Sequence, residues 1–210
     1  MSYMINIVCA LGGALFGSWI GHKFTISFFN SRTKKQKIAL YDEVQIINED
    51  YINWLNILID EFNEPLKDSY SGAPFIHTKL LDNLVVELSS TDEMLTKNQR
   101  RLLVGLSNKN RALAVKDNER DLCINDLRTK SDQLDDRERF RATKNIEFWT
   151  AHLLREVIEI IFYTSKLNEE SNNFIFGKYE IIEQIKAVCK YSNLDFDEQF
   201  WQKVIQRISA

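Results

Sequence analysis

The stretch YDEVQIINEDYINWLNILIDEF, residues 41 to 62, decides the fold class of this 210-residue chain. Its apolar residues recur every three or four positions, which is the spacing of one face of an α-helix. The predicted apolar stripe consists of Tyr41, Val44, Ile46 or Ile47, Tyr51, Trp54 or Leu55, Leu58 and Phe62. We therefore expect a helix over residues 37–66 that buries this stripe.

The same helical spacing continues to the C-terminus. The chain holds only two prolines, and the alternation typical of strands does not persist, so an all-α fold is predicted. The S-x-x-E spacing of Ser90 and Glu93 predicts a capping box at the start of a helix over 91–134. The further expected helices are one from near Pro74 that uses Phe75, Leu80, Leu81, Leu84 and Leu88, one over 91–134, one that contains Ile146, Trp149, Leu153, Val157, Ile160 and Leu167, and two over 178–191 and 197–208.

The expected helix over 91–134 is rich in charge. Four leucines share a heptad position, namely Leu106, Leu113, Leu127 and Leu134. Arg120 takes the position in their middle and the companion positions are mostly polar, so a coiled coil is not predicted. We expect a partly exposed helix or helix pair, with packing between subunits as one arrangement.

Charge is unevenly distributed along the chain. Acidic residues dominate 38–96 and basic residues dominate 97–144, which favours packing of the two segments within one chain or between neighbours. An RNA-binding face on 97–144 is the alternative, but no aromatic residue lies among its basic residues before Phe140.

The N-terminal segment is strongly apolar. It carries no Lys, Arg, Asp or Glu from Met1 to His22, and a helix that ends at Lys23 reaches across a hydrocarbon core of roughly 30 Å. A cleaved signal peptide is the alternative. Such a peptide needs a basic region before its apolar part and small residues at its cleavage site, whereas this segment has no such basic region and bulky Phe24 follows it. We expect a retained transmembrane anchor over 1–30.

A basic juxtamembrane turn over 31–37 and a helical bundle over 38–210 are expected to follow the anchor. The basic residues on this side of the anchor predict that the bundle faces the cytoplasm. These residues are Lys23, Arg32, Lys34, Lys35 and Lys37. The three widely spaced cysteines form neither a disulfide framework nor a metal motif, which agrees with a reducing compartment.

Small residues gather on one face of the expected anchor helix. They are Asn6, Ala10, Gly13, Gly17 and Gly21. Small residues at four-residue spacing let helix backbones approach closely in lipid, so we predict a homo-oligomer that associates through this face. The alternative is that glycine is simply common in membrane spans. The Asn6 amide suits an interface or a water-filled lumen, which admits a pore.

Motifs of catalysis are missing from the sequence. It contains neither a Gly-rich phosphate loop nor an HExxH motif nor a nucleophile elbow. His152 and Arg155, one helical turn apart, are weak candidates for acid-base chemistry, and a structural histidine is the favoured interpretation. We expect a protein that is not an enzyme, with no metal and no cofactor.

The span with GGALFGSWIG, residues 12–21, the basic NSRTKKQK, residues 30–37, and the helical domain together resemble the small accessory membrane proteins of type VI-B CRISPR systems. The resemblance implies a HEPN-like bundle and an oligomeric pore in the bacterial inner membrane that strengthens RNA-guided antiviral defence. A HEPN ribonuclease carries an arginine a few residues before a histidine, whereas Arg141 lies too far before His152. RNA cleavage is therefore not expected.

The expected function is an oligomeric pore-forming or membrane-perturbing protein. Its expected partners are the lipid bilayer, further copies of the chain and, functionally, an RNA-guided CRISPR effector, with no DNA. The alternatives are a non-conducting membrane-tethered scaffold or adaptor and a HEPN-like RNase that would depend on His152.

Overall fold

The computed structural model describes residues 2–66, 69–76, 78–90, 95–130 and 133–209, with side chains in the first helix from Gly12 onward. Every regular element in this part of the chain is a helix, which confirms the predicted all-α class. The helices are α1 (Ser2–Asn63), α2 (Lys79–Ser89), α3 (Lys97–Lys130), α4 (Asp136–Glu170), the short 3-10 helix η1 (Ser171–Asn173), α5 (Ile181–Tyr191) and α6 (Glu198–Ser209).

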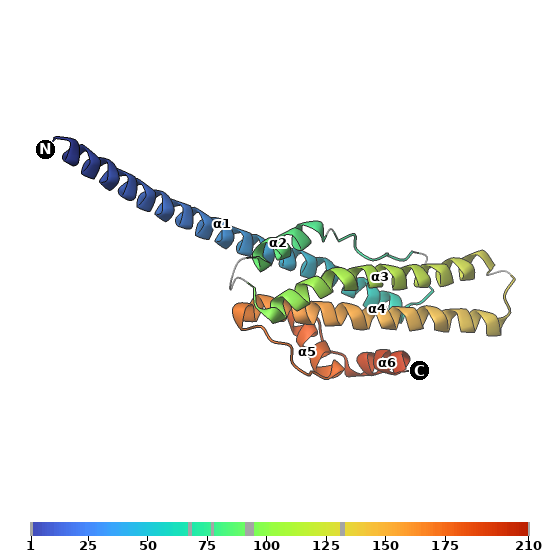
Figure 1. The fold of residues 1–210 in the computed structure, drawn as a ribbon. Coiled ribbons are helices and arrows are strands. Elements are labelled where there is room, and N and C mark those ends of the chain that lie inside the picture. The colour runs from blue at the N-terminus through green and yellow to red at the C-terminus, as the bar shows by residue number, and fades with distance from the viewer. Residues whose placement is uncertain (1, 67–68, 77, 91–94, 131–132, 210) are drawn as a thin grey trace.

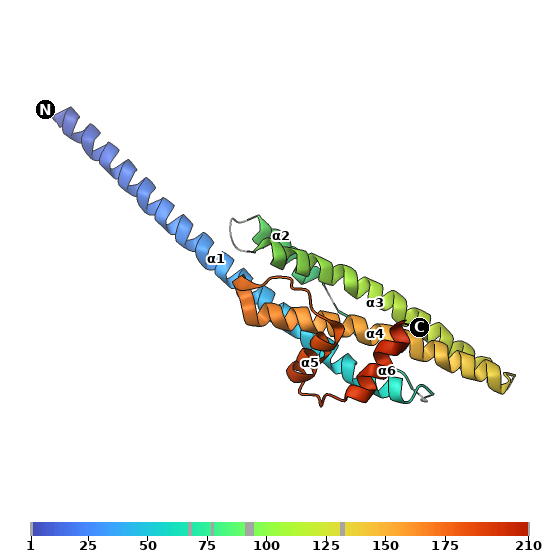
Figure 2. The same cartoon turned by 90° about the horizontal axis from the view of Figure 1, so that it is seen from below.

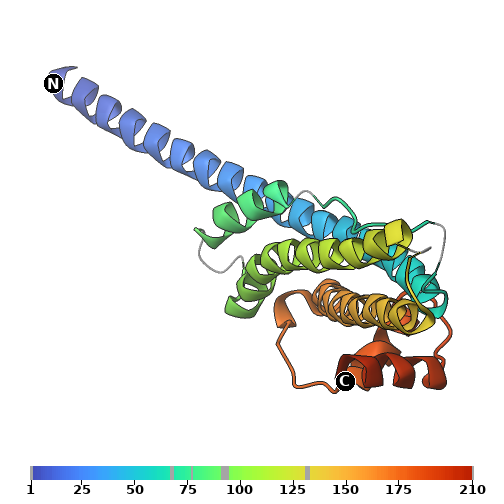
Figure 3. The same ribbon diagram turned by 90° about the vertical axis from the view of Figure 1, so that its right-hand side faces the viewer.

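The N-terminal half of α1 projects as a rod from a bundle that its C-terminal half forms with the other helices (Figure 1). α3 and α4 run antiparallel as a long hairpin, and α1 packs along α4. α2 lies against α1 and α3 where α1 leaves the bundle (Figure 2). α5 and α6 cover the side of α4 that faces away from α3 (Figure 3).

Residues 31–37 are helical, although the sequence predicted a turn there. They form the middle of α1, a single helix of 62 residues. The segment holds neither glycine nor proline, and its Lys, Arg and Gln residues favour helix. The Thr33 hydroxyl donates a hydrogen bond to the Phe29 carbonyl at 2.8 Å, so this side chain also follows the helix. The rod is therefore continuous with the bundle.

The predicted transmembrane anchor, residues 1–30, belongs to α1 from Ser2 onward. Among the residues that the structure describes, no helix combines the length and the apolar character needed to cross a membrane. Asn6, Cys9 and Ala10 fall in α1, but their side chains lie outside the described part.

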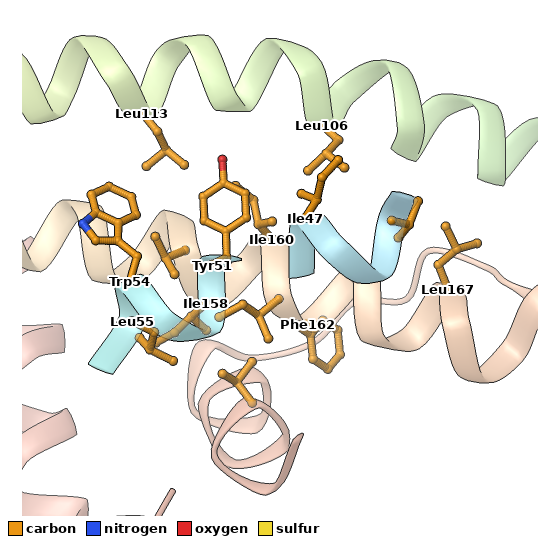
Figure 4. Close-up of a cluster of buried hydrophobic side chains, with 14 of the residues drawn as sticks. Ile47, Tyr51, Trp54, Leu55, Leu106, Leu113, Ile158, Ile160, Phe162 and Leu167 are labelled. Carbon is orange, nitrogen blue, oxygen red and sulfur yellow. The ribbon is translucent and has the colours of Figure 1, made fainter. Parts of the chain in front are cut away.

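The predicted stripe of α1 forms the core of the bundle. Val44, Tyr51, Leu58 and Phe62 are buried, and both Trp54 and Leu55 are buried with them. In Figure 4 the α1 side chains meet residues of α3 and α4, among them Leu106, Leu113, Ile158, Ile160 and Phe162. Each such side chain contributes about 1.5–3 kcal/mol when fully buried. This packing fixes α1 against the hairpin.

The structure settles one open detail of the stripe and corrects another. Ile47 is buried and Ile46 is 53% exposed, which settles the register between them. Tyr41 is only half-buried, and Leu40 fills the core in its place. The stripe therefore begins one residue earlier than the sequence indicated.

The helix that follows α2 begins later than predicted. Ser90 is the C-cap of α2, and its hydroxyl donates to the Glu87 carbonyl at 2.6 Å, while Glu93 lies outside the described residues. The cap of α3 is made by Thr96 and Gln99. The backbone amide of Gln99 donates a hydrogen bond to the Thr96 hydroxyl at 3.2 Å, and the backbone amide of Thr96 donates one to the side-chain oxygen of Gln99 at 2.7 Å. This T-x-x-Q box starts α3 at Lys97.

The start of α2 also differs from prediction, whereas α4, α5 and α6 lie near their predicted places. α2 begins at Lys79 rather than near Pro74, and Phe75 is 84% exposed instead of buried. In α4 five of the six predicted apolar residues are buried and Trp149 is half-buried. α5 and α6 begin within three residues of their predicted starts.

Candidate functional site: the projecting half of α1

Residues 12–32, here called the projecting segment, expose large apolar side chains along their whole length. Their exposed fractions are 72% for Leu15, 65% for Phe16, 58% for Trp19, 74% for Phe24, 44% for Ile26, 67% for Phe28 and 56% for Phe29. Monomeric soluble proteins rarely leave a continuous apolar surface of this kind in water. The projecting segment is therefore a candidate interaction surface.

The glycines at four-residue spacing, Gly13, Gly17 and Gly21, lie on an open face of this segment. A methyl group built on Gly13, Gly17 or Gly21 would meet no described atom within 4 Å. Four-residue spacing in one continuous helix places the three glycines on the same face. This face is free to receive another helix, whereas the Phe16 and Trp19 rings contact each other in a tilted arrangement with their centroids 6.0 Å apart.

Two polar side chains of the projecting segment find interaction partners within the segment itself. The Thr25 hydroxyl donates to the Gly21 carbonyl at 2.8 Å. The Lys23 ammonium lies 5.7 Å from the centroid of the Trp19 ring, which is a cation–π arrangement. Neither group requires a partner from the bundle.

The predicted interfacial basic residues divide into two groups. Lys37 donates to the Asn172 side chain at 2.7 Å and so fastens η1 to α1. Arg32 lies 3.6 Å from the Glu87 carboxylate. Lys34 and Lys35 are exposed and pair with no carboxylate of the described residues. Lys37 and Arg32 therefore contact other elements of the bundle, whereas Lys34 and Lys35 do not within the described residues.

The weak catalytic candidates lie far from this surface, on α4. The half-buried His152 ring packs edge-on against Phe148 at 4.4 Å, and Arg155 is exposed. Burial lowers the pKa of His152, and the positive charges of Lys116 and Arg155 lower it further. His152 is therefore neutral at neutral pH, and its contacts favour a structural role.

Two basic residues of α3 pair with acidic residues of α4. Lys109 lies 2.6 Å from Glu159, and Lys116 lies 2.7 Å from Glu156. Burial opposes the charge of Glu156, but the hydrogen bond from Lys116 and the charge of Lys109 outweigh it and lower the pKa of this carboxyl. The acidic partner of α3 is thus largely α4, whereas the sequence indicated residues 38–96.

One pair does join the predicted segments, and it involves the residue that interrupted the heptad pattern. Arg120 is fully buried and pairs with Glu61 of α1 and Asp117 of α3. It also donates to the Ser71 carbonyl at 2.9 Å, while the Ala73 amide donates to Asp117 at 2.6 Å. The sequence did not identify this network as a site. Its only signal was a single charge in an otherwise apolar heptad position.

Two further features bear on chemistry. No group of three or more metal-ligating side chains is placed to hold a metal ion in the described part of the chain. A cavity of about 260 Å³ lies between α3 and α4, with Leu102, Leu106 and Ile160 among its apolar lining residues and Arg101 and Lys109 among its charged ones. The residues that line it do not form a recognisable catalytic site.

Comparison with protein-family models, with curated proteins and with solved structures gives no match for this chain. The resemblance to the type VI-B CRISPR accessory proteins therefore stays a prediction.

Proposed function

We propose that this protein is a non-enzymatic membrane protein of the bacterial inner membrane, which oligomerises through α1 and acts as a pore or membrane-perturbing effector, with the bundle in the cytoplasm. The role in CRISPR antiviral defence is part of the proposal and comes from the resemblance alone. One observation carries the membrane association: large apolar side chains are exposed along the whole projecting segment.

The physical argument begins with the cost of this surface in water. Burying one large apolar side chain is worth about 1.5–3 kcal/mol, and the segment exposes several in succession. The sequence before it, Met1 to Leu11, adds no charged side chain. Lipid is the environment that covers such a helix on every side, and the helix satisfies its own backbone hydrogen bonds there.

Oligomerisation is supported by the open glycine face. In lipid there is little hydrophobic drive to bring helices together, so close backbone packing must supply it. Gly13, Gly17 and Gly21 have free space at the position of a side chain. A second copy of α1 fits this face because its own glycines allow the same approach.

The test of this proposal compares two leucine substitutions in adjacent positions. Gly17→Leu inserts a bulky side chain into the open face, so we expect the complex to lose mass in mild detergent. Phe16→Leu keeps an apolar side chain on the bulky face and serves as the matched control, with the mass of the wild type. Equal masses for both variants and the wild type would contradict association through the glycines.

Membrane leakage separates the pore from its alternative. On expression, a pore-forming protein causes dye uptake or depolarisation, whereas a membrane-tethered scaffold assembles without leakage. The third candidate, a HEPN-like RNase, predicts RNA cleavage that His152→Ala abolishes. The neutral, aromatic-packed state of His152 disfavours that candidate.

A further inference from the structure

A hollow of about 270 Å³ lies at the base of the projecting segment. It is lined by Phe28, Ser31, Arg32, Lys35 and Gln36. The spacings of three and four residues place these side chains on one face of α1. The hollow therefore combines one aromatic wall with two cations and two polar side chains.

The bundle balances only one of the two positive charges of the hollow. Glu87 of α2 is the carboxylate beside it, and the Gln36 amide donates a hydrogen bond to that carboxylate. Arg32 forms an exposed ion pair with Glu87 at 3.6 Å, a distance too long for a hydrogen bond. Lys35 pairs with no carboxylate of the described residues. The hollow thus retains net positive charge and guanidinium donors for an anion.

The height of the hollow on α1 identifies the kind of anion. Exposed apolar side chains continue to Phe29. At about 1.5 Å rise per residue, Arg32 lies roughly 4.5 Å and Lys35 roughly 9 Å beyond Phe29 along the helix axis. Helical side chains tilt toward the N-terminus, so both cations reach back toward the apolar part. When that part lies in hydrocarbon, with the long Lys23 side chain reaching toward the interface, Arg32 and Lys35 stand at the level of the lipid phosphates.

We propose that this hollow binds the phosphate of an anionic phospholipid, with Arg32 and Lys35 on the phosphate oxygens and Phe28 against the adjoining glycerol and upper acyl region. The assignment rests on the proposed membrane association. Guanidinium groups hold phosphate oxygens in paired hydrogen bonds, and basic clusters next to an apolar helix attract anionic lipids.

The experiment uses the full chain and two vesicle compositions, pure phosphatidylcholine and phosphatidylcholine with one quarter phosphatidylglycerol. Each basic residue near an anionic surface contributes about fivefold to binding, so Arg32→Gln with Lys35→Gln should lower partitioning to the anionic vesicles by about 30-fold. Partitioning to pure phosphatidylcholine should stay unchanged. The matched control, Arg137→Gln with Arg141→Gln, removes two exposed charges at the far end of the hairpin (Figure 1) and should leave both values unchanged.

The outcomes separate the two proposals. Wild type that binds neither vesicle overturns the membrane association itself. Wild type that binds both equally, or a hollow variant that behaves like the control, overturns the phospholipid site and leaves the membrane association standing. Inorganic phosphate is added at constant ionic strength as a further arm. If it displaces the anionic preference, the hollow holds free phosphate and the lipid assignment is wrong.

Discussion

Arg120 of α3 lies 2.5 Å from Glu61 of α1, Nη1 to Oε2, with side-chain exposures of 0% and 2%. This buried pair joins the hairpin to the helix that carries the projecting segment. Loop residues complete it, because the Ser71 amide donates to Glu61 at 2.7 Å and Gly72 lies so close to Asp117 that a methyl group there would approach the carboxylate to 3.3 Å. The network therefore holds α1, α3 and the loop in one arrangement.

Removing the cation should destabilise the bundle strongly. Arg120→Met leaves Glu61 and Asp117 buried without their partner, which typically costs about 3–5 kcal/mol of unfolding free energy. Chemical denaturation followed by circular dichroism measures this loss. Lys130→Met is the control, because its pair with Asp126 is exposed and such pairs contribute at most about 1 kcal/mol. Equal losses in the two variants would contradict a structural role for the buried pair.

The cap of α3 gives a second stability prediction. Thr96→Ala removes the hydroxyl that accepts from the Gln99 amide, and loss of an N-cap costs about 1 kcal/mol. Ser90→Ala removes only an exposed hydroxyl at the end of α2, so its cost should be much smaller. Thermal melts of the two variants decide between the observed cap and the cap predicted at Ser90. A larger loss for Ser90→Ala would favour the latter.

The helices of the bundle could be predicted because apolar periodicity reports burial directly. Leu58 and Phe62 recur with the helical period and are buried. The continuity of α1 could not be predicted in this way. The segment over 31–37 is polar and carries no periodic signal, so its helix follows from propensity and from the packing of residues on both sides.

The buried network around Arg120 could not be predicted from the sequence, for a different reason. Glu61 and Arg120 are far apart in sequence, and single charges normally indicate exposure. Only the tertiary packing of α1 on α3 brings them together. In the candidate site, the glycine spacing and the basic residues could be predicted from the sequence. The hydrogen bond from Lys37 to Asn172 could not, because it depends on where η1 lies.

His152 should make stability depend on pH. Its pKa is lowered from 6.5 in the folded chain, first by burial and then by nearby positive charges. The unfolded chain therefore binds a proton more readily, so stability is unaffected above pH 6.5 and falls as the pH drops below it. His152→Gln should reduce this fall between pH 7 and pH 5. The check is the difference between the melting temperatures of wild type and variant at each pH, and a constant difference would contradict it.

Topology provides a test that does not depend on assembly. Five basic residues follow the apolar N-terminal stretch on its C-terminal side, so the C-terminus is expected in the cytoplasm. A reporter fused after Ala210 should show cytoplasmic activity. A periplasmic signal would reverse the orientation and would remove the argument for reduced cysteines.

The Asn6 amide distinguishes a lumen from a closed interface. Asn6 shares the helical register of Gly13 and Gly17, and a buried amide in lipid needs either a partner or water. If the face lines a lumen, Asn6→Leu should change conductance in reconstituted bilayers while the oligomer keeps its mass. Closed packing predicts the reverse, an oligomer of altered stability in detergent that conducts neither before nor after the change. Wild-type conductance that Asn6→Leu leaves unaltered would place this face away from any lumen, and the pore would then have to be lined by another face of α1.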